Sequence, residues 1–367
     1  MNKRERILRT LNIEEPDKLP ISELVIEGRL MQAITGKELT VPVSVETPVI
    51  DDWEVEKKIW DYQIECYKKV DFDMINTWLS VPEGWKLKRR ADGTIVDIWG
   101  KVLMLDKRSK QWSPHGTVFN TPEDFERFEL PDPTATGWVH STEYVKKTVG
   151  DTMAVSTMVR DPFAHLWEMF TPTKFVMWMY ENPAVIKRAH DRMTDYFIEI
   201  IKQAAEAGAD LIIGAGDFAE EKNPMIPVDF FRKVIFPNLK KQINVAHKRG
   251  LKFIKHSDGN INPLIDDLAK IVDGLHSLDP SAGVDIGKVK ARYGDKLILM
   301  GNVSVDNLAR NSMEEIIEET KDCIRKASPG GGHILSSSNS WAAGAKLENC
   351  LAMVETGRKH GRYPISI

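Results

Sequence analysis

Short apolar segments alternate with longer amphipathic segments along most of this chain. The apolar segments span five to eight residues, are rich in β-branched side chains and end in glycine or polar residues. This pattern is typical of strands that are buried on both faces of a parallel sheet. Eight such strands are expected, at residues 18–23, 72–78, 152–159, 208–214, 251–256, 272–276, 297–302 and 332–336.

Between these segments, apolar residues recur at the three- and four-residue spacing of a helix that buries one face. Helices are expected at residues 4–12, 54–70, 163–180, 183–207, 229–249, 263–270, 284–293, 313–327 and 347–359. Repeated strand–helix units with right-handed crossovers close a parallel sheet on itself. We therefore expect an α/β fold of the (β/α)8 TIM-barrel type, formed by residues 1–367 as a single domain after an N-terminal helical segment.

One region departs from this alternation. From about residue 85 to residue 110, the chain has strand-like alternating segments on either side of Arg90-Ala91-Asp92-Gly93-Thr94. An Asp-Gly pair between alternating segments is a strong signal for a tight turn between two antiparallel strands. A β-hairpin insertion into the barrel is therefore expected at about residues 85–110.

Polar and aromatic residues collect where the predicted strands end. In a (β/α)8 barrel, the carboxyl ends of the strands carry the functional site, whereas the amino ends serve stability. The clustering of polar residues at one end of the strands therefore predicts a functional site there. The residues concerned are Glu23, Trp78, Arg160, Asp217, His256, Asp258, His276, Asn302, Ser336 and Asn339.

The segment from Lys252 to Asn260 carries the most informative pair. His256 and Asp258 are two residues apart at the end of a predicted strand, so their side chains can share one face. Imidazole and carboxylate groups bind metal ions and also act as general acids and bases. The alternative for Asp258 is a structural role as the N-cap of the helix that follows.

Composition excludes several classes of function. The chain is 42% hydrophobic and has a net charge of −4, without a basic run that would favour nucleic acid as a partner. Cys66, Cys323 and Cys350 are too widely spaced for a disulfide framework or a paired-cysteine metal site. Neither a signal peptide nor a run of 18 apolar residues is present, which indicates a cytoplasmic protein without a membrane partner.

Four segments resemble the uroporphyrinogen decarboxylase superfamily: His256-Ser257-Asp258-Gly259-Asn260, Met300-Gly301-Asn302-Val303, Gly330 to Asn339, and Gly361-Arg362-Tyr363-Pro364. The superfamily has two main branches. One contains porphyrinogen decarboxylases, and the other contains zinc-dependent methyltransferases that transfer methyl groups to or from corrinoid proteins. The resemblance itself implies a barrel fold and one of these two chemistries.

The residues that differ from each branch narrow this choice. The decarboxylases carry Arg-Gln-Ala-Gly-Arg-Tyr after the first strand, where this chain reads Leu24-Val25-Ile26-Glu27-Gly28-Arg29, and Asp73 is only a loose counterpart of their essential aspartate. The thiol methyltransferases use a His-x-Cys pair and a later cysteine. This chain has His256-Ser257-Asp258 and roughly Ser338-Asn339 there, so both thiolates are missing and oxygen and nitrogen ligands remain.

The resemblance is strongest to aromatic O-demethylase methyltransferases, whose zinc is held by Glu and His residues. By this resemblance, the zinc ligands are Glu220 or Glu221 and His256, with Asp258 as a further candidate, although the middle acid of the pattern falls at Ile235. The expected acid–base or supporting groups are Asp217, His276 and Asp258. The expected substrate-binding residues are Trp78, Arg160, Phe163, Trp167, Asn339 and Trp341.

The implied reaction moves a methyl group from a methoxylated, aromatic donor to the cobalt(I) of a corrinoid. Zinc would polarise the ether oxygen, and an acid would protonate it as it leaves. Because the chain lacks an Asp-x-His-x-x-Gly corrinoid motif, the corrinoid is expected on a separate partner protein.

Two other functions stay open at this point. The first is a metal-free decarboxylase of a smaller carboxylated substrate that uses Arg160 and an aspartate. The second is a degenerate barrel that only binds a corrinoid protein or a small ligand. Zinc stoichiometry separates the methyltransferase from both, and release of carbon dioxide would select the decarboxylase. The sequence leaves the oligomeric state open, a homodimer included.

Overall fold

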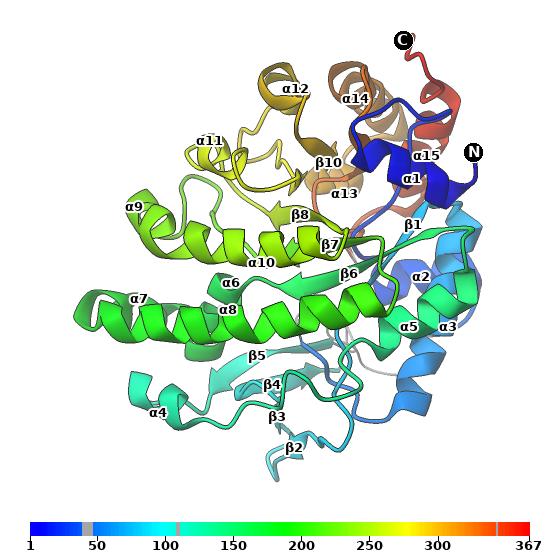
Figure 1. Ribbon diagram of the computed structural model, residues 1–367. Helices are drawn as coiled ribbons and strands as arrows, with labels where there is room; N and C mark the ends of the chain where they lie inside the picture. Colours follow the sequence, from blue (N-terminus) through cyan, green and yellow to red (C-terminus); the bar gives the residue numbers. More distant parts are fainter. Residues whose placement is uncertain (39–46, 108–110, 343) are drawn as a thin grey trace.

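The computed structural model describes residues 1–38, 47–107, 111–342 and 344–367, and its centre is a curled parallel sheet (Figure 1). The seven strands have the order β1-β6-β7-β8-β9-β10-β11, and neighbouring strands are parallel throughout. They are β1 (Met74–Thr77), β6 (Ala154–Arg160), β7 (Leu211–Ala215), β8 (Lys252–Ser257), β9 (Gly274–Ser277), β10 (Ile298–Val303) and β11 (His333–Ser337). The predicted barrel fold is confirmed.

The first predicted strand, residues 18–23, is not a regular strand but fills the gap between the two edges of the sheet. Ile21 forms a parallel bridge with Leu335 of β11, and the amide of Ser22 donates to the Leu335 carbonyl at 3.1 Å. On its other side, the Ile21 carbonyl accepts from the amide of Asp73 at 2.8 Å, just before β1. Pro20 has no N–H to donate, so a continuous ladder cannot form here.

Helices cover the outside of the sheet, as Figure 1 shows for α8 and α10. The larger ones are α3 (Trp53–Val70), α5 (His140–Val149), α8 (Pro183–Glu206), α10 (Phe236–Lys248), α12 (Ile286–Tyr293), α14 (Met313–Ala327) and α15 (Leu347–His360). Shorter ones are α2 (Gly28–Thr35), α4 (Pro122–Arg127), α9 (Val228–Phe230), the π-helical η1 (Phe231–Ile235), α11 (Ile265–Leu268) and α13 (Val305–Arg310). No helix in the described ranges is long and apolar enough to cross a lipid bilayer.

The predicted helix at residues 163–180 is two helices, α6 (Pro162–Phe170) and α7 (Pro172–Glu181). Thr171 between them has a positive φ of 71°, which a helix cannot accommodate. Pro172 then occupies the first turn of α7, the one place in a helix that tolerates proline. The proline therefore ends one helix and begins the next.

The N-terminal helix α1 (Lys3–Leu11) plugs the amino end of the barrel, which confirms the predicted N-terminal helical segment. Its Ile7 and Leu11 pack with the side chains that fill the barrel interior. These interior residues include Met74, Ala154, Leu211, Ile213, Ile254, Ile298, Met300 and Ile334. Because apolar side chains fill the barrel interior at this end, the open mouth of the barrel lies at the opposite end.

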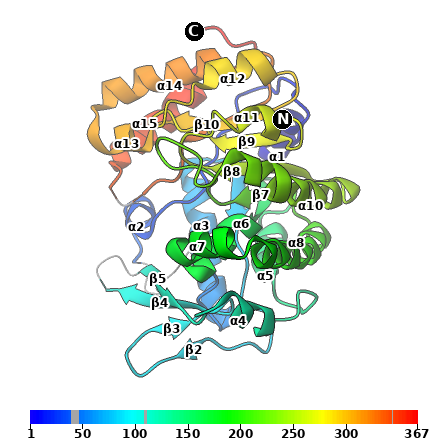
Figure 2. The ribbon, with the colours of Figure 1, turned by 90° about the vertical axis from the view of Figure 1, so that its left-hand side faces the viewer.

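The insertion is larger than the predicted hairpin. It forms a four-stranded antiparallel sheet of β2 (Lys88–Arg89), β3 (Ile95–Val96), β4 (Lys101–Asp106) and β5 (Gln111–Thr117). The turn at residues 90–94 joins β2 to β3 as predicted, whereas residues 108–110 lie outside the described ranges. Figure 2 looks onto the carboxyl ends of the barrel strands and shows this sheet below them. The insertion thus forms part of the rim around the barrel mouth.

Candidate metal centre

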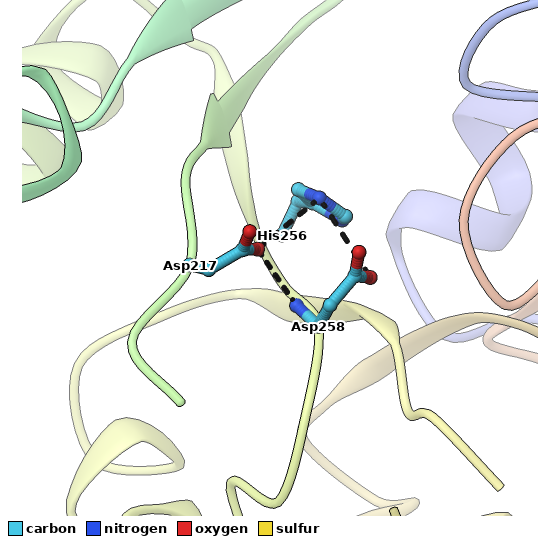
Figure 3. A group of neighbouring side chains, drawn as sticks. All are labelled: Asp217, His256 and Asp258. Atoms are coloured by element: carbon cyan, nitrogen blue, oxygen red, sulfur yellow. Dashed lines mark hydrogen bonds and ion pairs between the residues drawn. The ribbon is translucent and has the colours of Figure 1, made fainter. Parts of the chain in front are cut away.

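Three side chains from two neighbouring strands meet at the carboxyl end of the sheet (Figure 3). Asp217 lies two residues beyond the end of β7, His256 is the next-to-last residue of β8, and Asp258 follows β8 directly. Each offers one metal-ligating atom, and these atoms all lie within 4.8 Å of one another. The prediction that His256 and Asp258 share one face of the strand is confirmed.

The imidazole of His256 lies between the two carboxylates. Its Nε2 is 3.7 Å from Asp217 Oδ1 and 3.9 Å from Asp258 Oδ1. The backbone amide of Asp258 donates to Asp217 Oδ1 at 2.9 Å, which ties the two loops together. The Asn339 amide donates to Asp258 Oδ2, whereas Asp258 Oδ1 is buried without a hydrogen-bond partner among the described residues. Buried polar atoms are rarely left without a partner, so this oxygen points to a missing ligand.

Burial sets the protonation of the group. It lowers the pKa of His256 to about 4, so the imidazole is neutral, which is the form that binds metal ions. Burial, together with the nearby Asp217 carboxylate, raises the pKa of Asp258 to about 8. Without a cation, a proton is therefore held where two carboxylates face each other. A divalent ion would relieve the same repulsion by displacing that proton.

This donor set fits a catalytic zinc ion. Such sites use three protein ligands from His, Asp, Glu or Cys and keep a fourth position open for water or substrate. Two atoms bound to one tetrahedral zinc at about 2.0–2.1 Å lie roughly 3.3 Å apart. The two separations from His256, 3.7 and 3.9 Å, exceed this by a few tenths of an ångström, and all three atoms lie within 4.8 Å of one another, so the side chains would have to move closer together around an ion.

A second histidine orients the first. His276 on β9 is fully buried, and its Nδ1 lies 2.7 Å from His256 Nδ1, within hydrogen-bond distance. Burial and the neighbouring His256 hold the pKa of His276 well below its usual value, so both rings are neutral. A partner on the remote nitrogen of a ligating histidine fixes its tautomer and its direction. His276 therefore turns the Nε2 of His256 toward the two carboxylates.

Lys255 joins the two loops from the opposite side of the strand. Its buried ammonium donates to the carbonyl of His256 at 2.7 Å, to Gly214 at 3.4 Å and to Gly216. Asp161, at 3.6 Å, provides the counter-charge. Sequence reasoning missed this residue, although a lysine inside an apolar strand segment is itself a signal, because lysine is almost never fully buried without a partner. Lys255 thus holds both ligand-bearing backbones in register.

The predicted ligands Glu220 and Glu221 do not join the group. Both are exposed on the loop that follows Asp217. That loop is held by its backbone, since the Glu220 amide donates to the Asn223 carbonyl and the Glu220 carbonyl accepts from the Asn260 amide, both at 2.8 Å. The described residues thus bring together Asp217, His256 and Asp258, rather than the glutamates and His256.

The residues predicted to bind the substrate fall into two groups. Phe163 and Trp341 are 1% and 0% exposed, respectively; Phe163 packs against Phe218, and Trp341 packs against Phe72. Trp78 and Trp167 are partly buried, and Asn339 reaches the metal group through Asp258. Arg160 at the end of β6 forms an ion pair with Glu168 of α6. Trp78, Arg160 and Asn339 are therefore the members of this set that face open space near the centre.

A cleft beside the centre encloses about 1140 Å³, including open solvent at its mouth. It lies between α2, α3, β5 and the loop after β11. Trp78 and Asn339 are on its wall, so it adjoins the metal group directly. The rest of the wall consists of residues that sequence reasoning missed: Val25, Ile26, Glu27, Gly28, Met31, Ile59, Gln63, Gln111, Trp112, Ser113, Pro114, Val305, Ser340 and Ala342. Five segments that are far apart in sequence supply them, so no local sequence motif indicates the cleft.

Comparison with known proteins links the chain to two kinds of enzyme. Uroporphyrinogen decarboxylase from Myxococcus xanthus (strain DK1622) is 25% identical over 246 residues, which cover 65% of this chain and 68% of that enzyme. The methylcobamide:CoM methyltransferase MtaA from Methanosarcina barkeri is 25% identical over 218 residues, or 59% of this chain. The chain spans 61% of the length of this second relative.

Solved structures extend the likeness of the fold to the whole chain. A methyltransferase from Methanosarcina mazei superposes with a TM-score of 0.74 at 21% identity and covers 98% of this chain. A B12-independent methionine synthase from Shewanella sp. W3-18-1 gives a TM-score of 0.53 at 12% identity. The family model for uroporphyrinogen decarboxylase (URO-D) matches residues 109–360, more than half of the chain. This protein therefore belongs to the uroporphyrinogen decarboxylase family.

Proposed function

We propose that this protein is a zinc-dependent methyltransferase that moves a methyl group from a methoxylated, aromatic donor to the cobalt(I) of a separate corrinoid protein. One observation carries the proposal: Asp217, His256 and Asp258 converge at the barrel mouth, and one Asp258 oxygen lacks a partner among the described residues. The similarity to a methylcobamide methyltransferase supports the same chemistry.

The reaction is a displacement at the methyl carbon. The carbon–oxygen bond of the ether breaks while a cobalt–carbon bond forms, and cobalt(I) supplies the electron pair and becomes cobalt(III). The oxygen keeps the pair of the broken bond and takes up a proton. Bound zinc would supply a Lewis acid that draws electron density from this oxygen and makes it a better leaving group.

The chain's own residues would prepare this step. Asp217, His256 and Asp258 would hold the ion, and three protein ligands would leave a zinc ion free to accept the ether oxygen as a further ligand. His276 and Asn339 orient two of these ligands through single hydrogen bonds. The half-buried ring of Trp78 offers an apolar wall between the centre and the cleft for a flat donor.

The ligand types favour an oxygen-bound donor. Thiolate ligands suit soft, sulfur-rich zinc chemistry, whereas carboxylate and imidazole ligands make a harder centre. Asp258 occupies the position of the cysteine in the His-x-Cys pair of the thiol methyltransferases that the sequence resembles. In this proposal, Glu220 and Glu221 are not required as ligands, because the three converging side chains already supply a complete protein set.

The decarboxylase alternative has less support from the geometry. Asp73, the loose counterpart of the decarboxylase aspartate, lies before β1 at the amino end of the barrel, where Arg6 and Arg358 bind it. The mouth presents two carboxylates around a neutral histidine, and its Arg160 is already paired with Glu168. A substrate with several carboxylates would need several free cations there.

The test combines metal analysis with methyl transfer to cob(I)alamin, the free cofactor in its cobalt(I) state. We expect about one zinc per chain, formation of methylcobalamin from methoxyphenols, and loss of both after treatment with a chelator. Adding zinc back should restore methyl transfer, which would show that the lost activity depends on the metal. Full activity in the metal-free protein, or carbon dioxide release from carboxylated substrates without methyl transfer, would overturn the proposal.

A further inference from the structure

We propose that the cleft beside the metal centre binds the methyl donor and selects an uncharged methoxy-arene that carries a hydroxyl group over one that carries a carboxylate. This inference rests on the proposed function and names the substrate class of the same site. The cleft reaches the centre through Asn339, which lines its wall and donates a hydrogen bond to Asp258. A donor lying in the cleft would therefore place its methoxy group next to the ligands.

The shape of the cleft suits a flat ring. Trp78, at the end of β1, and Trp112, on β5 of the insertion, both line it and are both partly buried. Aromatic side chains of this kind bind rings by stacking or by edge contacts, in addition to burying apolar area. The insertion thus contributes to the donor site, which explains why it lies at the barrel mouth (Figure 2).

Gln63 provides the polar recognition. It lies on α3 one helical turn after Ile59, and both residues line the cleft. Gln63 is 3% exposed, no hydrogen bond joins its side chain to another described residue, and its amide atoms are not fully enclosed, so they stay open to the cleft. An amide that is open on the wall of a cleft and has no partner among the described residues is available to a polar group of the ligand. A phenolic hydroxyl can donate to its oxygen or accept from its nitrogen.

The charges of the wall oppose an anionic donor. The lining contains Glu27, and no lysine, arginine or histidine is among its described residues. Arg160 lies in a separate hollow on the far side of Trp78, where Glu168 neutralises it. Glu168 also binds the buried Lys101 at 3.2 Å, so that network is already compensated. A carboxylate in the cleft would face Glu27 without a cation among the described wall residues to offset it.

Binding measured without any corrinoid tests this inference separately from the reaction. Titration of the zinc-loaded protein with 2-methoxyphenol, followed by calorimetry or by tryptophan fluorescence, should give a Kd at least about tenfold below that of 4-hydroxy-3-methoxybenzoate. Glu27→Gln should narrow this difference. Equal or tighter binding of the benzoate, or of tetramethylammonium, would overturn the inference.

Gln63→Leu should raise the Kd of 2-methoxyphenol about tenfold, because a ligand hydroxyl loses its partner while the volume of the side chain is nearly kept. The matched control is Gln32→Leu, an exposed glutamine on α2 that does not line the cleft. If Gln63→Leu lowers the melting temperature strongly, Gln63→Met serves as the second variant. Unchanged binding in both Gln63 variants would overturn the inference. Tight binding without methyl transfer would instead count against the proposed function alone.

Discussion

Two buried aspartates at opposite ends of the barrel have opposite surroundings. Asp73, just before β1 at the amino end, is fully buried, and both of its oxygens are bonded. Arg6 of α1 binds one oxygen, while Arg358 of α15 at 2.9 Å and the Ile21 amide at 2.8 Å bind the other. Through these bonds Asp73 joins α1 and α15, at the two ends of the chain, to the segment at residues 18–23 that fills the gap in the sheet. This carboxylate therefore serves stability.

Asp258 at the carboxyl end lacks such compensation. Asn339 binds one of its oxygens, the other has no partner among the described residues, and the nearest ionisable groups are His256 and a second carboxylate, Asp217. The difference teaches that burial alone does not reveal function. A compensated buried carboxylate stabilises the fold, whereas an uncompensated one among other ligands leaves room for a cation.

The largest effect should follow from removing one of the proposed metal ligands at the carboxyl end of the barrel. His256→Ala and Asp258→Ala each remove one ligand, so we expect bound zinc to fall below about a tenth per chain and methyl transfer to fall by about a thousandfold or more. Metal analysis and methylcobalamin formation measure both. Asp229→Asn, on the exposed start of α9, is the control. Normal zinc content in either ligand variant would contradict the assignment.

Removing the charge of Asp73 at the amino end should instead lower the stability of the fold. Asp73→Asn leaves two arginines without their shared carboxylate, so the free energy of unfolding should fall by roughly 3–5 kcal/mol. Zinc content per folded chain should not change. Asp258→Asn in the metal-free protein should change stability by less than about 1 kcal/mol or increase it, because one of two facing carboxylates is removed. Urea unfolding of both variants measures the two changes in the free energy of unfolding. A similar decrease in both variants would contradict the prediction.

An intermediate effect should come from the lysine that joins the two ligand loops. Lys255→Met should weaken zinc binding about 10- to 100-fold, because the backbones of Asp217 and His256 lose their common donor. Lys252→Met is the matched control, since Lys252 pairs with Asp273 at the other end of β8. Asp161→Asn, which can still cap α6, tests the same link without removing the lysine. Zinc competition titrations give the affinities, and equal values in all variants would exclude this positioning role.

The smallest effect concerns another buried carboxylate, Glu23, which accepts hydrogen bonds from the neutral donors Leu24 and Ser337. Burial raises its pKa from 4.5 to about 8. Between these values the folded chain holds a proton that the unfolded chain has released, so the free energy of unfolding falls as pH rises from about 4.5 to 8. The slope due to this group is at most about 1.4 kcal/mol per pH unit.

Glu23→Gln should remove this part of the slope, because the amide does not titrate. Denaturant unfolding at pH 5, 6.5 and 8 measures the difference between the two proteins. An identical pH dependence in both would show that Glu23 is ionised in the folded protein.

Much of the barrel was predictable from local pattern, because a strand buried on both faces must be apolar along its whole length. Seven of the eight predicted strands are present, whereas the first one, at residues 18–23, is irregular because of Pro20. The break at Thr171 within the predicted helix 163–180 and the third and fourth strands of the insertion were missed. These features depend on a single proline and on pairing between segments, to which a periodicity search is insensitive.

The candidate site was predictable only where a strand holds it. Two-residue periodicity placed His256 and Asp258 on one face, and the structure agrees. The loop after β7 has no such rule, and the sequence led to Glu220 or Glu221, rather than Asp217, as the partner of His256. The sequence did not show that Phe163 and Trp341 are buried either, because an aromatic residue near a strand end can face either the core or the mouth.

By itself, the sequence determined the strand–helix alternation, the family resemblance and the pairing of His256 with Asp258, because each depends on neighbours along the chain. The tertiary structure alone decided which carboxylate completes that pair and which side chains enclose the cleft. Lys255 and the Asp258 amide bring Asp217 into place across two strands, and α3, β5 and the loop after β11 supply the cleft. These contacts join residues far apart in sequence, so only packing brings them together.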